Sequence, residues 1–468
     1  MLTPGAGWAR QLALALLGAA VGCTPAPAPP SATPPPPTPV LPAVTLTVGT
    51  GPIHTQHLVL GLAQGGESLD PAFLHPAIPW IKPLGISYVR IDHVFNYPGL
   101  VTRRSAGGLT YAWTPLDTVV DDIRAMGAAP LLDLSYMPPA LNPESVLLPP
   151  LDWNEWAKLA NSTVRHFNSD RQLGLPYWEI WNEPNLWGFW HGSYPQYLAL
   201  YDFARRAIRD RDPAARVGGP ALSSYEESAL DWLLGFENGQ PDGGYLGFLS
   251  WHAYGWTPAE LAGQVRAARA LLARKRPQGP PVELMITELG VRTGGPDDTS
   301  AGGAADTSAA AAQLLASIAA LDAAGLDKLF VFELRDGPPP AGEFWGRYGI
   351  LTYHLHPKPI YHALRAYTAL GRDLLPVTVV PARSDVGLLA APGGNAILWY
   401  QGTAPLHVVV QLPPAAGPQV RATLFDATHN NPAAGHGGDQ PTSSGPLATA
   451  GLAFDLAPDS VVILAPVR

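Results

Sequence analysis

Short apolar runs alternate with longer segments of helical periodicity between about residues 57 and 370. The apolar runs are rich in β-branched and aromatic residues, as buried strands are. Eight such runs occur, and they begin at His57, Ile86, Ala129, Tyr177, Arg216, Gly247, Val282 and Asp327. The clearest helical segments between them span residues 153–167, 194–210 and 308–325. Strands that alternate with helices predict a parallel sheet with helical crossovers.

A (β/α)8 TIM barrel, a fold of the α/β class, accounts best for eight such strands in one domain. The alternative is an open, doubly wound sheet, which often carries a glycine-rich phosphate loop after its first strand. No such loop follows the run that begins at His57. The sequence therefore predicts a closed barrel with some enlarged loops.

From about residue 374 the helical pattern ends, and short alternating strands follow, separated by Pro, Gly and Asn turns. This pattern predicts an all-β sandwich domain over residues 374–468, with a long mobile loop at 427–448. Trp399 or Tyr400 could serve there as platforms for a carbohydrate. Packing against the barrel as a stabilising domain is the favoured role, and glycan binding is the alternative.

The N-terminal residues 1–22 contain one Arg followed by an apolar run that is too short to span a bilayer. They predict a secretory signal peptide. The end of this segment, Ala20 to Cys23, resembles a bacterial lipobox, in which the cysteine is lipidated and becomes the new N-terminus. Cys23 is the only cysteine of the chain. We expect lipidation of Cys23, and an ordinary signal peptide with an incidental cysteine is the alternative.

Residues 23–43 consist mainly of Pro, Ala, Thr and Ser and predict a semi-rigid linker. At about 3.1 Å per residue such a linker reaches roughly 60 Å. The expected organisation is a signal peptide at 1–22, the linker at 23–43, the barrel at 44–373 and the sandwich at 374–468. We expect an exported protein that touches a membrane only through Cys23, anchored to the bacterial cell envelope or otherwise secreted.

Composition narrows the class of protein. The chain has 468 residues, 47% hydrophobic and 14% charged, which supports a large globular core. A formal net charge of −9 without a basic cluster argues against a nucleic-acid partner. His354 and His356 form an H-x-H without acidic or thiolate residues nearby in the sequence, and no P-loop, H-E-x-x-H or C-x-x-C motif occurs. We expect neither a metal nor a cofactor, and a neutral substrate.

Two predicted strands end in a glutamate. The stretch PYWEIWNEPN (176–185) reads as a strand stopped at Asn182-Glu183-Pro184, and VELMITELG (282–290) places Glu288 at its tip. Catalytic groups of β/α barrels gather at the carboxyl ends of the strands. In glycoside hydrolysis one carboxylate attacks the anomeric carbon, while a second carboxyl group donates a proton to the leaving oxygen. The charge of one such carboxylate should favour the protonated form of the other.

Other strand ends supply supporting candidates. Arg90 ends the second strand, beside Asp92 and His93, and could orient a carboxylate or bind sugar hydroxyls. His252 and Tyr254 share a face at the end of the sixth strand. The eighth strand ends with three charged residues that we expect to form a network at the barrel rim: Glu333, Arg335 and Asp336.

Aromatic residues crowd the loops after these strands. They are Tyr97, Trp113, Trp187, Phe189, Trp190, Tyr194, Trp256, Phe344, Trp345 and Tyr348. Aromatic faces suit the apolar faces of sugar rings, so this crowding favours a carbohydrate cleft. We expect Trp187, Trp256 and Trp345 to contact substrate. The glycine-rich stretch 290–306 could form a lid, although disorder is the favoured reading.

These motifs resemble the clan A glycoside hydrolases, and within them glycoside hydrolase family 39, the family of β-xylosidases, α-L-iduronidases and exopolysaccharide-degrading relatives. The matching pieces are WEIWNEPN, SYMPPAL, SWHAYG, ITE and YGILTYHLHPKPIYHAL, which lie in the predicted barrel. The resemblance implies that Glu183 is the acid/base, Glu288 the nucleophile, and Asn182 a hydrogen-bonding partner of the sugar. Arg90, His252 and Tyr254 would support them.

The chain departs from the family at two places. Leu289 follows the predicted nucleophile where the family usually has an aromatic residue, and FELRDG follows the eighth strand where many clan members have a tryptophan. Both departures concern sugar specificity. The leading hypothesis is a retaining glycosidase, and the alternative is a non-catalytic carbohydrate-binding lipoprotein on a barrel scaffold. The presence of both Glu183 and Glu288 favours the enzyme.

Overall fold

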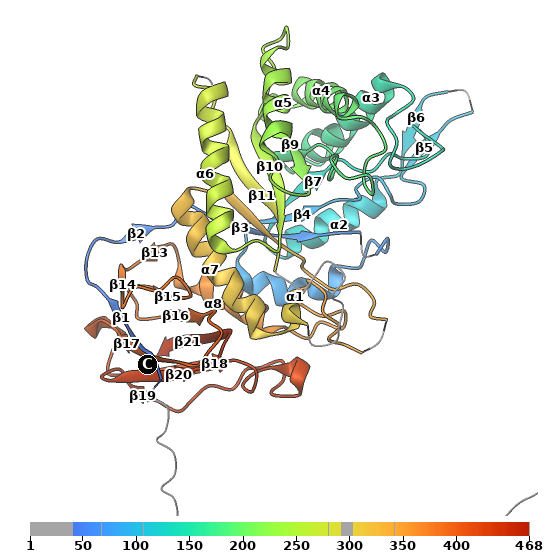
Figure 1. Ribbon diagram of the computed structural model, residues 1–468. Helices are drawn as coiled ribbons and strands as arrows, with labels where there is room; N and C mark the ends of the chain where they lie inside the picture. Colours follow the sequence, from blue (N-terminus) through green and yellow to red (C-terminus); the bar gives the residue numbers. More distant parts are fainter. Residues whose placement is uncertain are drawn as a thin grey trace, which may run out of the picture. The chain divides into compact units, whose positions relative to one another are not determined.

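A closed barrel of eight parallel strands forms the centre of the computed structural model (Figure 1). The structure describes residues 41–66, 68–105, 107–278, 280–291, 303–340 and 342–467. The barrel strands are β3 (Val59–Gln64), β4 (Tyr88–Ile91), β7 (Ala129–Asp133), β8 (Tyr177–Glu179), β9 (Arg216–Leu222), β10 (Phe248–Tyr254), β11 (Glu283–Gly290) and β12 (Lys328–Phe332). Each overlaps one of the eight predicted runs, and β12 pairs with β3 to close the barrel. The predicted barrel is confirmed.

Helices connect the barrel strands, and a last helix follows β12. They are α1 (Ile78–Ile81), α2 (Thr114–Ala125), α3 (Trp153–Val164), α4 (Tyr194–Arg211), α5 (Glu227–Asn238), α6 (Pro258–Lys275), α7 (Ser308–Ala324) and α8 (Pro359–Leu370). Capping boxes at Ser193 and Thr257 begin α4 and α6, because each side chain accepts from a backbone N–H of the first turn. A π-helical turn, η3 (Arg165–Asp170), extends α3. None of the described helices is long and apolar enough to cross a membrane.

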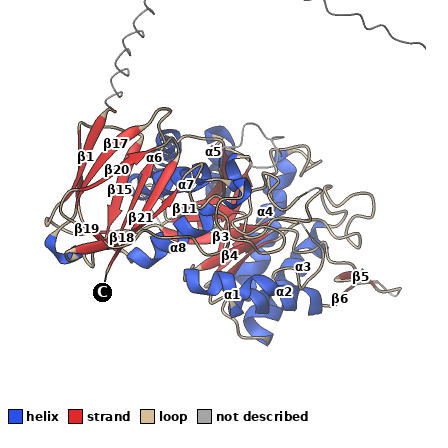
Figure 2. Cartoon of the chain, turned by 90° about the horizontal axis from the view of Figure 1, so that it is seen from below, coloured by secondary structure: helices blue, strands red, loops and turns tan. Residues whose placement is uncertain are grey.

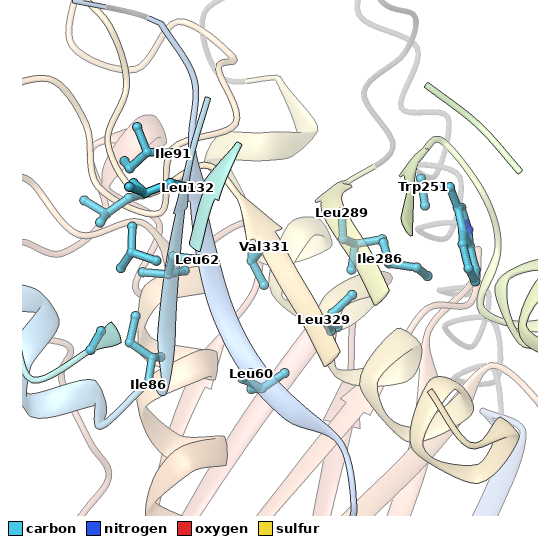
Figure 3. Close-up of a cluster of buried hydrophobic side chains, with 14 of the residues drawn as sticks. Leu60, Leu62, Ile86, Ile91, Leu132, Trp251, Ile286, Leu289, Leu329 and Val331 are labelled. Carbon is cyan, nitrogen blue, oxygen red and sulfur yellow. The ribbon is translucent and has the colours of Figure 1, made fainter. Parts of the chain in front are cut away.

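Successive side chains along each barrel strand point alternately outward and inward, and they form two separate apolar layers. Outward residues pack beneath the helices, and Figure 3 shows ten of them: Leu60, Leu62, Ile86, Ile91, Leu132, Trp251, Ile286, Leu289, Leu329 and Val331. Inward residues fill the barrel floor: Ala63, Leu131, Tyr177, Phe248, Met285 and Phe330. Glycine makes room for these rings, because a Cβ on Gly61 or Gly218 would lie within 2.6 Å of Phe330 or Phe248. Side chains therefore close the barrel below its carboxyl end.

The C-terminal region forms a sandwich of two sheets. The first has the order β14 (Val377–Val380), β1 (Ala43–Val48), β17 (Leu406–Gln411) and β20 (Leu452–Leu456). The second has the order β15 (Val386–Ala390), β16 (Ala396–Tyr400), β21 (Ser460–Pro466), β18 (Gln419–Phe425) and β19 (Leu447–Ala448). Two small sheets pair β2 (His54–Thr55) with β13 (Asp373–Leu374), and β5 (Val101–Arg103) with β6 (Leu109–Tyr111). The predicted sandwich is confirmed.

One predicted boundary is wrong. Residues 44–48 were assigned to the barrel, but β1 pairs antiparallel with β14 and parallel with β17 of the sandwich. The alternating pattern AVTLTV predicts a half-buried strand and carries no information about its partner, which lies more than 300 residues away in the chain. The signal peptide, Cys23 and nearly all of the linker lie outside the described residues.

The sandwich packs on α7 and α8 (Figure 2). Ile397, Trp399, Phe425 and Val461 belong to the same buried cluster as the barrel core. Trp399 and Tyr400 are only 6% and 2% exposed. They cannot serve as platforms for a carbohydrate, because packing against neighbouring strands and helices covers both rings. The stretch 427–448 contains the short 3-10 helix η6 (Pro432–Ala434), and hydrogen bonds from Asn430 to Leu424 and Thr442 hold it to the sandwich.

A buried ion cluster joins three loops of the barrel. The Lys358 Nζ lies 2.7 Å from a carboxylate oxygen of Asp306 and 2.7 Å from one of Asp336, and all three side chains are fully buried. Arg335 instead binds the backbone carbonyl groups of Phe73 and Tyr353, at 2.5 Å for Phe73. Of the three residues expected to form a network at the rim, only Asp336 belongs to this ion cluster, and its partner Lys358 was not predicted.

We expect Lys358→Met to lower the free energy of unfolding by about 3 to 5 kcal/mol, because two buried carboxylates would lose their counter-charge. Urea unfolding measures this change. The triple variant Lys358→Met, Asp306→Asn, Asp336→Asn removes the charges as well and should recover part of the loss. If the single and triple variants were equally destabilised, lost packing would be the cause.

Candidate active site

Arg90 lies at the centre of a buried polar cluster on the inner face of the barrel. Its Nε donates to Glu179 at 2.5 Å, and its Nη2 donates to Asp133 at 2.9 Å. The same guanidinium donates through Nη1 to Glu288 at 2.7 Å and through Nη2 to Asn182 at 2.8 Å. Strand alternation explains the set, because Arg90, Asp133 and Glu179 occupy inward positions on three adjacent strands. One guanidinium thus ties the predicted nucleophile to the Asn-Glu-Pro stretch.

A β-bulge turns Glu288 into the barrel. Trp251 pairs with Ile286, but the next residue, His252, pairs with Glu288, so Thr287 is an extra residue on β11. Ile286 and Leu289 both belong to the outer apolar layer, whereas Met285 points to the barrel floor. Strict alternation from Met285 would have turned Glu288 outward. The bulge reverses this and aims the carboxylate at the strand ends.

Glu183 is held by the turn that follows β8. Trp181 and Glu183 have φ angles of 69° and 49°, a left-handed conformation that costs free energy for residues other than glycine. The Trp181 ring is fully buried against Trp190, with ring centroids 4.8 Å apart, and its Nε1 donates to the Phe189 carbonyl group. The Glu183 N–H donates to the Ala221 carbonyl group at 3.0 Å. Packing of the tryptophan therefore stabilises the turn that presents Glu183.

Glu183 and Glu288 both lie next to the imidazole ring of His252. The His252 Nδ1 lies 2.7 Å from Glu183 Oε1 and 3.4 Å from Glu288 Oε2. Tyr254 donates its hydroxyl hydrogen to Glu288 Oε2. One carboxylate oxygen of Glu183, one of Glu288 and a ring nitrogen of His252 all lie within 4.8 Å of one another. The predicted pair is therefore assembled in one place, although the two residues are 105 positions apart in the chain.

Burial and neighbouring charges shift the protonation equilibria here. Burial raises the pKa of Glu288 from its ordinary value, while His252 and Arg90 oppose the rise. Burial by itself would lower the pKa of His252, but the carboxylates of Glu288 and Glu183 outweigh it and raise that pKa. Burial also raises the pKa of Asp133 well above its ordinary value. His252 and Arg90 are thus the cations that favour the ionised form of Glu288.

A cavity of about 400 Å³ opens above this pair. Its lining consists of Gly65, Gly66, Asp92, His93, Asn182, Glu183, Phe189, Tyr254, Glu288, Phe332 and Tyr348. The volume falls in the range of small-molecule sites. Aromatic walls with carboxylates at the base suit a sugar ring, whose hydroxyl groups need acceptors and whose faces are apolar.

Four of the predicted site residues line this cavity, namely Asn182, Glu183, Tyr254 and Glu288. Arg90 and His252 are fully buried and contact the glutamates without appearing in its lining.

The three predicted tryptophans lie elsewhere. Trp187 is 73% exposed and stacks on His191, with ring centroids 4.3 Å apart. Trp345 is half-buried beneath the guanidinium of Arg347. Trp256 lines a different cavity. None of them is in the lining of the catalytic cavity in the part of the chain that the structure describes, where the aromatic residues are Phe189, Tyr254, Phe332 and Tyr348.

Several residues of the site were not predicted. Asp133 and Glu179 hold Arg90, and a signal for them exists, because each is an acidic residue inside an otherwise apolar strand. The pair Asp92 and His93, whose Oδ1 and Nδ1 lie 2.8 Å apart, contributes to the wall. Residue 66, which also lines the cavity, must be a glycine, because a Cβ there would lie 2.5 Å from the His93 ring.

Three groups of the site have a geometry that a metal could use, namely Glu183, His252 and Glu288. The Arg90 guanidinium, 2.7 Å from Glu288, would repel a cation at this place. In the folded chain His354 and His356 do have acidic partners, contrary to the prediction. The His354 ring contacts the carboxylate of Glu343, eleven residues before it, at 2.5 Å, and the His356 ring contacts the carboxylate of Asp439, in the sandwich, at 2.8 Å.

We expect His252→Gln to move the acidic limb of the pH–activity profile to higher pH. The protonated imidazole favours ionised Glu288, so its loss raises the pKa of this predicted nucleophile, which burial has already raised. The measurement is kcat/KM against pH on an activated aryl glycoside, whose departure needs no proton. His362→Gln, a buried histidine on α8, is the control. An unmoved limb would contradict this role, and the limb reports the coupled pair as a whole.

Comparison with known proteins agrees with this geometry. The model of the family "Glycosyl hydrolases family 39" matches residues 70–276, which include Glu183 but end before Glu288. The chain is 29% identical over 329 residues to a β-xylosidase of Geobacillus stearothermophilus, covering 62% of each protein. It is 31% identical over 160 residues to the human α-L-iduronidase, covering 32% of this chain and 24% of the relative. In both cases the match spans less than two thirds of the relative's length.

Solved structures show the same fold. The GH39 enzyme from Xanthomonas axonopodis pv. citri superposes with a TM-score of 0.72 at 20% identity, covering 92% of this chain and 98% of the other. A monomeric β-xylosidase from Caulobacter crescentus superposes with a TM-score of 0.73 at 19% identity, covering 91% and 100%. Over residues 70–276 the chain is therefore similar to the glycoside hydrolases of family 39, and its eight-stranded barrel has the fold of the solved enzymes.

Proposed function

We propose that the protein is a retaining glycosidase that works by double displacement. The observation that supports this proposal most strongly is the approach of the carboxylate oxygens of Glu183 and Glu288 to within 4.8 Å. Retaining pairs stand about 5 to 5.5 Å apart, whereas inverting pairs lie at roughly 6.5 to 9.5 Å to admit a water molecule. A separation of at most 4.8 Å between these oxygens lies near the retaining range and below the inverting range.

In the first step Glu288 attacks the anomeric carbon, and the bond from that carbon to the leaving oxygen breaks as Glu183 donates its proton to this oxygen. In the second step water attacks the anomeric carbon, Glu183 takes a proton from it, and the ester bond to Glu288 breaks. Arg90 and Tyr254 each hold one oxygen of Glu288 and so orient it for attack.

The direct test follows the first-formed product by NMR before mutarotation. Aryl glycosides are supplied as a panel that begins with the β-D-xyloside and the α-L-iduronide, the sugars named for two relatives. Retention of the substrate's anomeric configuration is the expected result. Inversion would rule out double displacement. Glycan binding without turnover of any substrate would instead support the non-catalytic alternative.

We also propose export with lipidation at Cys23, supported by the lipobox-like segment and the proline-rich linker after it. Wild type and Cys23→Ala are expressed in a bacterium and fractionated. We expect the wild type in the membrane fraction and the variant in the soluble fraction. Equal solubility of the two would leave an ordinary secretory signal as the explanation.

A further inference from the structure

A second cavity, of about 510 Å³, lies where the barrel meets the sandwich. The barrel contributes Trp256, Thr257, Pro258, Ala259, Ala304, Ala309 and Gln313, and the sandwich contributes Ser384, Asp385, Gln401 and Asp459. Trp256 and Thr257 follow the carboxyl end of β10, and Ala309 lies in the first turn of α7. These segments belong to the face of the barrel that carries the catalytic pair. The second cavity therefore opens at the same end of the barrel.

The lining of this cavity suits a neutral ligand with many hydroxyl groups. It offers one indole ring, that of Trp256, which is 37% exposed. Around the ring stand amide, hydroxyl and carboxylate groups, which accept and donate hydrogen bonds to hydroxyl groups. No Lys or Arg is among the described lining residues. An anionic ligand would therefore lack a partner, while a sugar could stack on the indole and hydrogen-bond around it.

The carboxylate of Asp385 in this cavity is already paired with a cationic side chain. Arg383 donates to both oxygens of Asp385, at 2.8 and 2.6 Å, so this carboxylate has its counter-charge without a ligand cation. The Gln313 Nε2 donates to the Trp256 carbonyl group at 3.3 Å and connects α7 to the loop that carries the indole. Both contacts fix the walls of the cavity before a ligand enters.

The two cavities share a loop. Tyr254 lines the catalytic cavity and Trp256 lines the second one, with Gly255 between them at a φ of 77°. Two residues span at most about 7 Å of chain. The backbone positions that carry Tyr254 and Trp256 are therefore close together, as a ligand made of several linked sugar rings would require if it contacted both residues.

We propose that the second cavity is a distal subsite for the same saccharide chain that the catalytic pair cleaves, formed jointly by the barrel and the sandwich. This inference rests on the proposed glycosidase function and specifies its substrate class as a neutral oligo- or polysaccharide. It also gives the sandwich a part in substrate binding that neither Trp399 nor Tyr400 can supply.

The experiment compares substrates of different length. The probes are the 4-nitrophenyl glycoside that the wild type cleaves fastest and oligosaccharides of two to six units of the same sugar. The wild type should gain in kcat/KM as the chain lengthens. Trp256→Ala and Gln401→Ala should each reduce the ratio of kcat/KM for the longest oligosaccharide to that for the aryl glycoside, by about fivefold to tenfold for the tryptophan.

Trp232→Ala is the matched control, because this tryptophan on α5 is 59% exposed and lines neither cavity. Its ratio should equal that of the wild type. The subsite proposal is wrong if the wild type cleaves an aryl glycoside but its kcat/KM does not depend on chain length. It is also wrong if the Trp256 and Gln401 variants keep the wild-type ratio. Neither result contradicts the proposed glycosidase function. If the wild type cleaves no glycoside, both proposals fall.

Discussion

Glu288→Gly should lower kcat by about four orders of magnitude or more, the scale on which loss of a nucleophile acts in other enzymes. Glu333, the acidic residue that follows β12, does not take the place of this carboxylate. Glu333, which is buried near the end of β12, accepts a hydrogen bond from Gln64 at 2.9 Å and does not line the catalytic cavity. Steady-state kinetics on an activated aryl glycoside measure the loss.

Azide should restore turnover in Glu288→Gly, because a small anion can occupy the space of the missing carboxylate beside Arg90. The product should be a glycosyl azide of inverted configuration, identified by NMR. Glu283→Gln is the control. This carboxylate lies at the amino end of β11, 2.9 Å from Lys328, and its loss should leave kcat near the wild-type value. Absence of rescue, together with labelling of another carboxylate by a fluorinated glycoside, would remove Glu288 from the role of nucleophile.

Glu183→Ala should lose activity according to the leaving group. A poor leaving group needs a proton to depart, so kcat/KM on an unactivated glycoside should fall by about 10² to 10⁴-fold. The glycosylation step on a dinitrophenyl glycoside should be nearly unaffected. Pre-steady-state kinetics separate this step from hydrolysis of the covalent intermediate.

Glu226→Gln is a control for Glu183→Ala, because Glu226 is an exposed glutamate that accepts from Asn185, at 2.5 Å, near the end of the same motif. It should preserve the wild-type dependence on leaving group. If Glu183→Ala lost the same factor on every substrate while glycosylation limited the rate, its role as the acid would be excluded.

The alternation of short apolar runs with helical segments was sufficient to predict the barrel, because short β-branched and aromatic runs indicate buried strands and a 3.6-residue period indicates a helix. All eight predicted strands occur. Glu183 could be predicted as well, since Asn182-Glu183-Pro184 ends a strand and carboxyl ends of barrel strands meet at one rim. Both predictions depend only on which residues follow one another along the chain, and the sequence gives this directly.

Other features depend on contacts between distant segments. The strand β1 joins the sandwich because β14 and β17 offer edges to it, and no pattern within Ala43–Val48 encodes that choice. The inward orientation of Glu288 depends on a bulge opposite His252, although alternation counted from Met285 points the side chain outward. The expected sites of Trp187, Trp256 and Trp345 were inferred from loop membership, which does not specify the direction of a side chain.

The sequence by itself determined the fold class, the eight barrel strands and the two glutamates on which the proposed chemistry depends, because local periodicity and strand termini encode them. Only the tertiary structure decided how these residues act together. It brought Glu183 and Glu288 to within 4.8 Å at His252, and it placed Arg90 between Asp133, Glu179 and Glu288. Distances across a barrel arise from closure of the sheet and from burial, and residues far apart in the chain acquire them only when the sheet closes.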